Sequence, residues 1–168
     1  MPDQIDIPAS FAPVADLTGK RVVITGASRG LGRLLAHAFS RGGGHLTLVA
    51  RTEKDLKEVA DALPGPTLVV TGDVTDEEFN ELVADATVAE WGGIDVWICN
   101  AGISPIVGGP LTTDPSVWRE ILEVNLTGAF LGARAAARSR RCRRTWATSR
   151  RWKASSAGRW SASADSTS

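Results

Sequence analysis

Residues 21–32 read Arg-Val-Val-Ile-Thr-Gly-Ala-Ser-Arg-Gly-Leu-Gly, and they give the clearest indication of the fold class. Its first five residues are a short run rich in β-branched side chains, which predicts a buried strand. After the glycines, apolar residues recur with the spacing of one helix face, at Leu31, Leu34, Leu35 and Ala38. The stretch therefore predicts a strand, a tight glycine turn and a helix in direct succession.

The same alternation of strand and helix continues to residue 131. Further strands are predicted at 45–50, 67–71 and 95–99, each followed by a helical pattern. An alternating order of this kind implies a parallel sheet with right-handed crossovers and helices on both faces. The predicted fold class is α/β, a Rossmann-like doubly wound parallel sheet that is truncated after about four strands and four helices. Its ligand should lie beyond the carboxyl ends of the strands.

Polar residues ahead of the later helices predict where each one begins. Thr52 can cap the second helix, Thr75 with Glu78 forms a capping-box pattern for the third, and Asp114 with Pro115 suits the start of the fourth. The predicted buried faces are Phe79, Leu82, Val83 and Ala86 in the third helix, and Trp118, Ile121, Leu122, Asn125 and Ala129 in the fourth.

The composition changes abruptly after Leu131. Residues 1–131 carry 9 Lys/Arg against 18 Asp/Glu, whereas residues 132–168 carry 10 against 1 and contain no Leu, Ile, Val, Met or Phe. We divide the chain into an N-terminal extension (1–17), an incomplete Rossmann-like domain (18–137) and a basic tail rich in Arg, Ser, Ala and Trp (138–168). The tail lacks the apolar surface that would offset its ordering entropy, so we expect it to be disordered.

The glycine turn has the features of a phosphate-binding loop. Gly26 permits a tight turn, Gly30 permits close approach of a pyrophosphate, and Gly32 permits close packing of the helix. A helix N-terminus in this position offers free N–H groups and a positive dipole end to the phosphates. The alternative interpretation is a glycine turn with a purely structural role.

Four motifs in order resemble the short-chain dehydrogenase/reductase family. They are the T-G-x-x-x-G-x-G turn of residues 25–32, Asp73-Val74, Asn100-Ala101-Gly102, and Asn125 in EVNLTGAF. The resemblance covers residues 18–131, roughly the first half of a typical member. It implies hydride transfer between a nicotinamide cofactor and an alcohol or carbonyl, with Asn125 as an active-site residue. The implied cofactor-binding residues are Gly26, Ser28, Arg29, Gly30, Leu31, Gly32, Arg51, Asp73, Val74, Asn100, Ala101 and Gly102, of which Asp73 would bond the adenine.

The second strand favours NADP(H) over NAD(H) as the cofactor. A carboxylate at its end would bond a ribose 2′-hydroxyl, but the strand ends Val49-Ala50-Arg51 and no carboxylate follows before Glu53. Arg51 and Arg29 can instead pair with a 2′-phosphate through their donor forks. The alternative is that both arginines are ordinary solvated surface residues.

The catalytic residues that the resemblance implies are mostly missing. The family uses a Tyr as proton donor, a Lys four residues later, a Ser on the substrate oxygen, and an Asn. The chain contains no tyrosine, Ser149 precedes Lys153 by four residues, and the 155–158 segment (SSAG) lacks a preceding apolar strand. Loss of a general acid costs on the order of 10²–10⁴ in rate. We expect the encoded chain to be inactive or nearly so.

Two explanations of the tail stay open. We favour a shift of reading frame near residues 134–138, because the composition changes inside a recognisable domain. The alternative is a genuine basic tail whose arginines and tryptophans contact nucleic acid. A further alternative for the whole chain is a dinucleotide-binding module without catalysis.

Cellular context and partners are predicted only broadly. Two distant cysteines, Cys99 and Cys142, favour a reducing cytoplasm and form no metal-ligand spacing, so we expect no metal. No signal peptide or membrane span is predicted. Family members often pair as homo-oligomers through the long helix and the next one, and we do not expect such pairing here. The unpaired fourth strand would favour aggregation.

Overall fold

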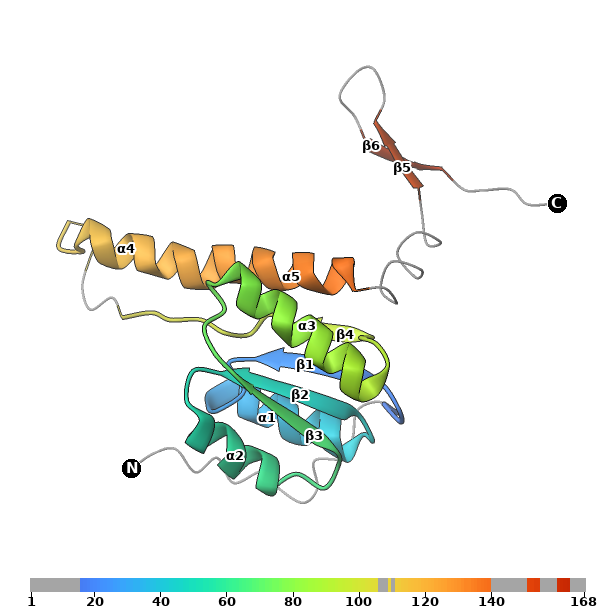
Figure 1. The fold of residues 1–168 in the computed structure, drawn as a ribbon. Helices are drawn as coiled ribbons and strands as arrows, with labels where there is room; N and C mark the ends of the chain where they lie inside the picture. The colour runs from blue at the N-terminus through green and yellow to red at the C-terminus, as the bar shows by residue number, and fades with distance from the viewer. Residues whose placement is uncertain (1–15, 106–108, 110, 140–150, 155–159, 164–168) are drawn as a thin grey trace.

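The computed structural model describes residues 16–105, 109, 111–139, 151–154 and 160–163 (Figure 1). Its main sheet has four strands, β1 (Arg21–Thr25), β2 (His45–Ala50), β3 (Thr67–Thr71) and β4 (Val96–Ile98). All neighbours pair in parallel, in the order β3-β2-β1-β4. The first three strands have the predicted bounds, and β4 is one residue shorter at each end. Most of the N-terminal extension lies outside the described residues.

Helices cover both faces of the sheet, as Figure 1 shows. On one face α1 (Gly30–Arg41) and α2 (Glu53–Asp61) pack on the sheet. On the other lie α3 (Glu77–Trp91) and α5 (Gly128–Arg138). Successive β1 side chains alternate between two cores, with Val22 and Ile24 in the first and Val23 in the second. The predicted doubly wound α/β fold is confirmed.

The strand order places a topological switch point between β1 and β4. The chain leaves β1 towards β2 and β3, then returns across the opposite face to add β4 on the other side of β1. In open α/β sheets the loops at such a point diverge and leave a crevice at the carboxyl ends of the strands. The glycine turn after β1 and residues 99–103 after β4 therefore meet at the same place.

Of the three predicted helix caps, one is confirmed, one is right in position only, and one is wrong. The Thr52 side chain makes no capping hydrogen bond, although Thr52 is the N-cap residue of α2. Asp76, one residue after Thr75, caps α3 by accepting from the backbone N–H groups of Glu78 and Phe79. Thr75 is instead held by Asp73, whose Oδ1 accepts from its N–H and its hydroxyl. The prediction for Asp114 is confirmed, because its carboxylate accepts from Ser116 N–H at 2.7 Å.

The buried face of α3 differs from the predicted one because two polar residues belong to it. Leu82 is 55% exposed, while Asn80 and Thr87 are buried. The Asn80 amide donates to the carbonyls of Val74 and Asp76, and Thr87 shares a hydrogen bond with Thr47 on β2. Buried polar groups are stable where their hydrogen bonds are satisfied, and an apolar repeat does not reveal them.

The predicted fourth helix is one continuous helical rod with an irregular centre. It consists of α4 (Pro115–Leu122), the π-helical segment η1 (Glu123–Thr127) and α5. Its predicted buried face is wrong in part, because Trp118 and Leu122 are exposed together with Leu126 and Phe130. Of these three segments, only α5 packs against the sheet and α3 through buried residues. They are Gly128, Leu131, Gly132, Ala135 and Ala136.

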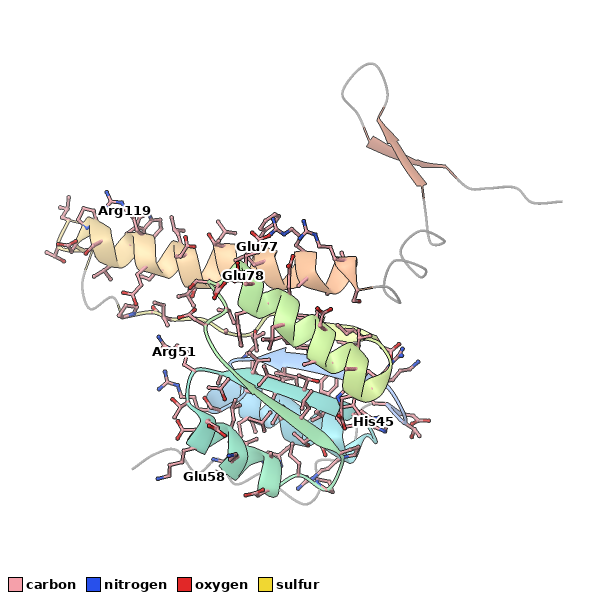
Figure 2. The ribbon with its side chains drawn as sticks, in the orientation of Figure 1. His45, Arg51, Glu58, Glu77, Glu78 and Arg119 are labelled. Atoms are coloured by element: carbon pink, nitrogen blue, oxygen red, sulfur yellow. The ribbon has the colours of Figure 1, made fainter. Side chains whose placement is uncertain are left out.

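Helix α5 crosses the composition boundary and ends at Arg138. Beyond Leu131 it is held by ion pairs to α3, in which Arg134 pairs with Glu77 and Arg138 pairs with Glu77 and Glu81. Figure 2 shows Glu77 at the start of α3, beside the long helix. The ordered body therefore extends beyond the change in composition.

Part of the tail differs from the disorder that we expected. Residues β5 (Arg151–Ala154) and β6 (Trp160–Ser163) pair antiparallel in a separate two-stranded sheet. The segments RWKA and WSAS alternate tryptophan or alanine with polar residues, and such alternation favours strands even without aliphatic side chains. The rest of the tail lies outside the described residues. Within the described part of the chain, no helix combines the length and apolar character needed to cross a membrane.

Candidate functional site

A cavity of about 460 Å³ opens at the carboxyl ends of the strands, at the switch point between β1 and β4. Eleven of the twelve predicted cofactor-binding residues line it, which are Gly26, Ser28, Arg29, Gly30, Leu31, Arg51, Asp73, Val74, Asn100, Ala101 and Gly102. The fold thus brings together motifs that lie up to 76 positions apart in the sequence. Gly32 is the exception, since it packs behind the wall of the cavity.

The glycine turn is shaped by two positions that admit no side chain. Gly26 has a φ of +65°, and a Cβ there would lie 2.8 Å from Ala101 Cα. A Cβ on Gly32 would lie 2.2 Å from the Gly26 carbonyl oxygen. Larger residues would force the turn away from the end of β4, so the wall of the cavity depends on these glycines. At Gly30 no protein atom lies within 4 Å of such a Cβ, which leaves space for a ligand.

Hydrogen bonds between Thr25 and the Asn100 segment fix the turn to β4. The Thr25 hydroxyl donates to the Ile98 carbonyl at 3.2 Å and accepts from the N–H groups of Asn100 and Ala101 at 3.0 and 3.1 Å. The Asn100 side-chain amide donates to the carbonyls of Thr25 and Gly26 at 3.0 and 3.2 Å. The two loops that flank the switch point therefore form one rigid floor.

The N-terminus of α1 provides a setting for an anion. Arg29, the N-cap residue, is extended, and its side chain makes no capping hydrogen bond. The first turn contains no acidic residue, and Gly30 and Leu31 line the cavity. Uncapped N–H groups and the positive end of the helix dipole favour a phosphate at such a position.

Both signs of charge border the cavity near α2. Arg29 and Arg51 are exposed and line it from the turn after β1 and the loop after β2. Figure 2 shows the Arg51 side chain extending outward from that loop. Asp73 and Asp55 also line the cavity. Asp73 Oδ1 already accepts from the Thr75 N–H and hydroxyl at 2.9 Å, which fixes its carboxylate.

The sequence did not identify six of the lining residues, which are Ala50, Thr52, Asp55, Gly72, Ile103 and Val124. Five of them, Ala50, Thr52, Gly72, Ile103 and Val124, directly adjoin a predicted site residue, so widening each motif by one position would have included them. Thr52 and Asp55 belong to the start of α2. The signal that was available for them was their closeness to Arg51, since a helix that follows a strand begins at the same edge of the sheet.

Asn125 lies beside the cavity and does not line it among the described residues. Its Oδ1 accepts from the Ile103 N–H at 2.8 Å, and its Nδ2 donates to the Ile103 carbonyl at 2.9 Å. Both ends of the side-chain amide are thereby used to fasten the segment after β4 to η1. Asn125 is thus connected to the cavity indirectly, because it holds the lining residue Ile103.

The other catalytic groups are not assembled in the described part of the chain. Lys153 lies in β5, whereas Ser149, Ser155 and Ser156 fall outside the described residues. Cys99 adjoins the site, but burial raises the pKa of its thiol, and the thiol contacts the Ala129 carbonyl at 3.4 Å. The described residues contain no group of three His, Cys, Asp or Glu side chains suited to a metal ion.

A doubly wound sheet with a cavity at its switch point is the arrangement typical of dinucleotide-binding α/β domains. A sequence model of the short chain dehydrogenase family matches residues 20–145. The chain belongs to that family.

Known relatives support the assignment. The chain is 39% identical over 131 residues to the short chain dehydrogenase pigC of Monascus ruber, covering 72% of this chain and 43% of the relative. It is 36% identical over 126 residues to 3beta-hydroxysteroid dehydrogenase 1 of Eggerthella lenta, covering 72% and 48%. A crystal structure of a short-chain type dehydrogenase/reductase from Mycobacterium marinum superposes with a TM-score of 0.70 at 39% identity, covering 74% of this chain and 51% of that one. The chain spans about half the length of these relatives.

Proposed function

We propose that this chain binds a nicotinamide dinucleotide in the cavity at the carboxyl ends of β1–β4. The observation that carries the proposal is the uncapped N-terminus of α1, which opens onto a cavity lined by the glycine turn. Gly30 leaves free space where a pyrophosphate would approach, and the exposed Leu31 offers an apolar contact beside it. The carboxylate of Asp73 and the Val74 backbone suit the adenine end of the ligand. Asn100, Ala101 and Gly102 supply the floor.

Preference for NADP(H) over NAD(H) is part of the proposal. Arg29 and Arg51 both line the cavity, and a guanidinium binds a phosphate through parallel N–H donors. A 2′-phosphate held there would gain two charge-assisted contacts that a 2′-hydroxyl would not gain.

We further propose that the encoded chain turns over an alcohol or carbonyl substrate extremely slowly or not at all. The bound nicotinamide would supply hydride chemistry, but the chain has no tyrosine to transfer the proton. Asn125 is the one residue that matches the family's catalytic set, and its side-chain amide is hydrogen-bonded to the backbone of Ile103. The chain would then act as a non-catalytic dinucleotide-binding module. This proposal includes a cytoplasmic location.

Calorimetry with NADPH and NADH tests the proposal directly. We expect NADPH to bind more tightly, and Arg51→Met to weaken NADPH about tenfold while changing NADH less than about twofold, because only NADPH carries the 2′-phosphate. Arg119→Met is the matched control, since Arg119 lies on α4 and does not line the cavity (Figure 2). No measurable binding of either nucleotide would refute the site, and readily measured NADPH-dependent carbonyl reduction would refute the inactivity.

A further inference from the structure

Asp55 contributes a negative charge to the lining of the cavity, to which Arg29 and Arg51 contribute positive charges. It is the third residue of α2, and it lines the cavity together with Arg51 and Thr52. Its neighbour Glu53 pairs with Lys57 at 2.5 Å, whereas no cation pairs with Asp55 among the residues that the structure describes. Asp55 is exposed, so its carboxylate is free to meet a ligand.

The charges of this lining act on the two cofactors in opposite directions. A 2′-phosphate carries nearly two negative charges, so Arg29 and Arg51 attract it while Asp55 repels it. A ribose 2′-hydroxyl can donate a hydrogen bond to a carboxylate, which is the usual way in which such folds hold NAD(H). Asp55 therefore opposes the preference that the arginines create.

We propose that Asp55 is a specificity-determining residue that reduces the difference in affinity of the site for NADP(H) and NAD(H). Its carboxylate weakens NADP(H) by repulsion and strengthens NAD(H) by accepting from the ribose. The inference rests on the proposed dinucleotide site and adds a residue that acts against the arginines. The site would then accept both cofactors, with a smaller preference than two arginines alone would produce.

Asp55→Asn in the full chain tests the proposal, with Glu58→Gln as the matched control. Both substitutions remove one negative charge from α2, but Glu58 lies further along the helix and does not line the cavity (Figure 2). Dissociation constants for NADPH and NADH are measured by calorimetry for each variant. We expect the ratio of the NADH constant to the NADPH constant to rise about fivefold in Asp55→Asn, since one charge is removed from a solvated wall. Glu58→Gln should change the ratio less than about twofold.

Two further measurements separate charge from structure. Asp55→Glu keeps the charge and should keep the ratio near that of the unchanged chain. In about 0.5 M salt the difference between Asp55→Asn and the unchanged chain should shrink, because screening weakens exposed charges. An equal ratio in Asp55→Asn and Glu58→Gln would overturn the inference. If the unchanged chain binds neither nucleotide, the proposed function fails together with this inference, and that failure is visible before any variant is made.

Discussion

Replacing Asp95 by Asn should destabilise the fold through a defined ion pair at the base of the sheet. Asp95 immediately precedes β4, and its carboxylate accepts from the Arg21 backbone N–H at 2.9 Å, from Nε at 2.6 Å and from Nη2 at 2.5 Å. Arg21 opens β1, so the pair ties together the amino ends of the two strands that flank the switch point. The Arg21 side chain is 14% exposed, and the substitution would remove the only carboxylate that pairs with it in the described structure.

The magnitude follows from the pKa of the carboxyl group. Hydrogen bonding to Arg21 lowers the pKa of Asp95 from 3.8 to about 2. A shift of that size corresponds to about 2.4 kcal/mol, and because the carboxylate keeps contact with solvent we expect about 1–2 kcal/mol after screening. Since the folded pKa is depressed, this stability is present above pH 3.8 and is lost as the pH falls towards 2.

Urea unfolding at pH 7 and at pH 3 tests this expectation. Asp95→Asn should lower the free energy of unfolding by about 1–2 kcal/mol at pH 7, and the gap from the unchanged chain should narrow to about half of that at pH 3. Asp85→Asn, at an exposed position on α3, serves as the control and should change it by less than about 0.5 kcal/mol. An equal effect of the two substitutions at pH 7, or a gap independent of pH, would refute the reasoning.

Three other substitutions test the site. Gly32→Ala should weaken NADPH binding at least about tenfold, because its Cβ would lie 2.2 Å from the Gly26 carbonyl; calorimetry checks this, and unchanged affinity would contradict the tight packing. Thr25→Val should lower the free energy of unfolding by about 1–3 kcal/mol because three hydrogen bonds of the hydroxyl disappear, whereas Thr25→Ser should recover most of it in urea melts. Asn125→Ala should speed hydrogen exchange of the Ile103 amide, which donates to Asn125; exchange as slow as before would mean that another group holds that segment.

The sheet and the glycine turn could be predicted because their signals are local. The strands predicted at 21–25, 45–50 and 67–71 match the observed strands residue for residue. The glycine positions likewise follow from backbone geometry that few other residues adopt. Where a side chain acts on its own backbone neighbourhood, the sequence alone is informative.

The errors at Thr87 and Trp118 have a different physical origin, since burial there depends on elements distant in sequence. Thr87 is buried against β2, where its hydroxyl is hydrogen-bonded to the hydroxyl of Thr47, and no pattern within α3 predicts that neighbour. Trp118 is exposed because the described body offers nothing for α4 to cover, although the helical period around it is regular. The place of Asp55 in the cavity lining likewise follows from how the sheet brings separate loops together, which no local pattern contains.

The ion pairs between α3 and α5 connect the acidic part of the chain (1–131) to its basic part (132–168). Arg134 and Arg138 come from the basic stretch, while Glu77 and Glu81 come from the acidic body, so part of the opposite net charges is neutralised inside the molecule. The length of the ordered end of α5 therefore depends on ionic strength. Salt weakens these exposed ion pairs but leaves the buried Leu131 and Ala135 in place. The last turns of α5 should fray first as salt rises, which makes the boundary of this domain a property of the solution as well as of the sequence.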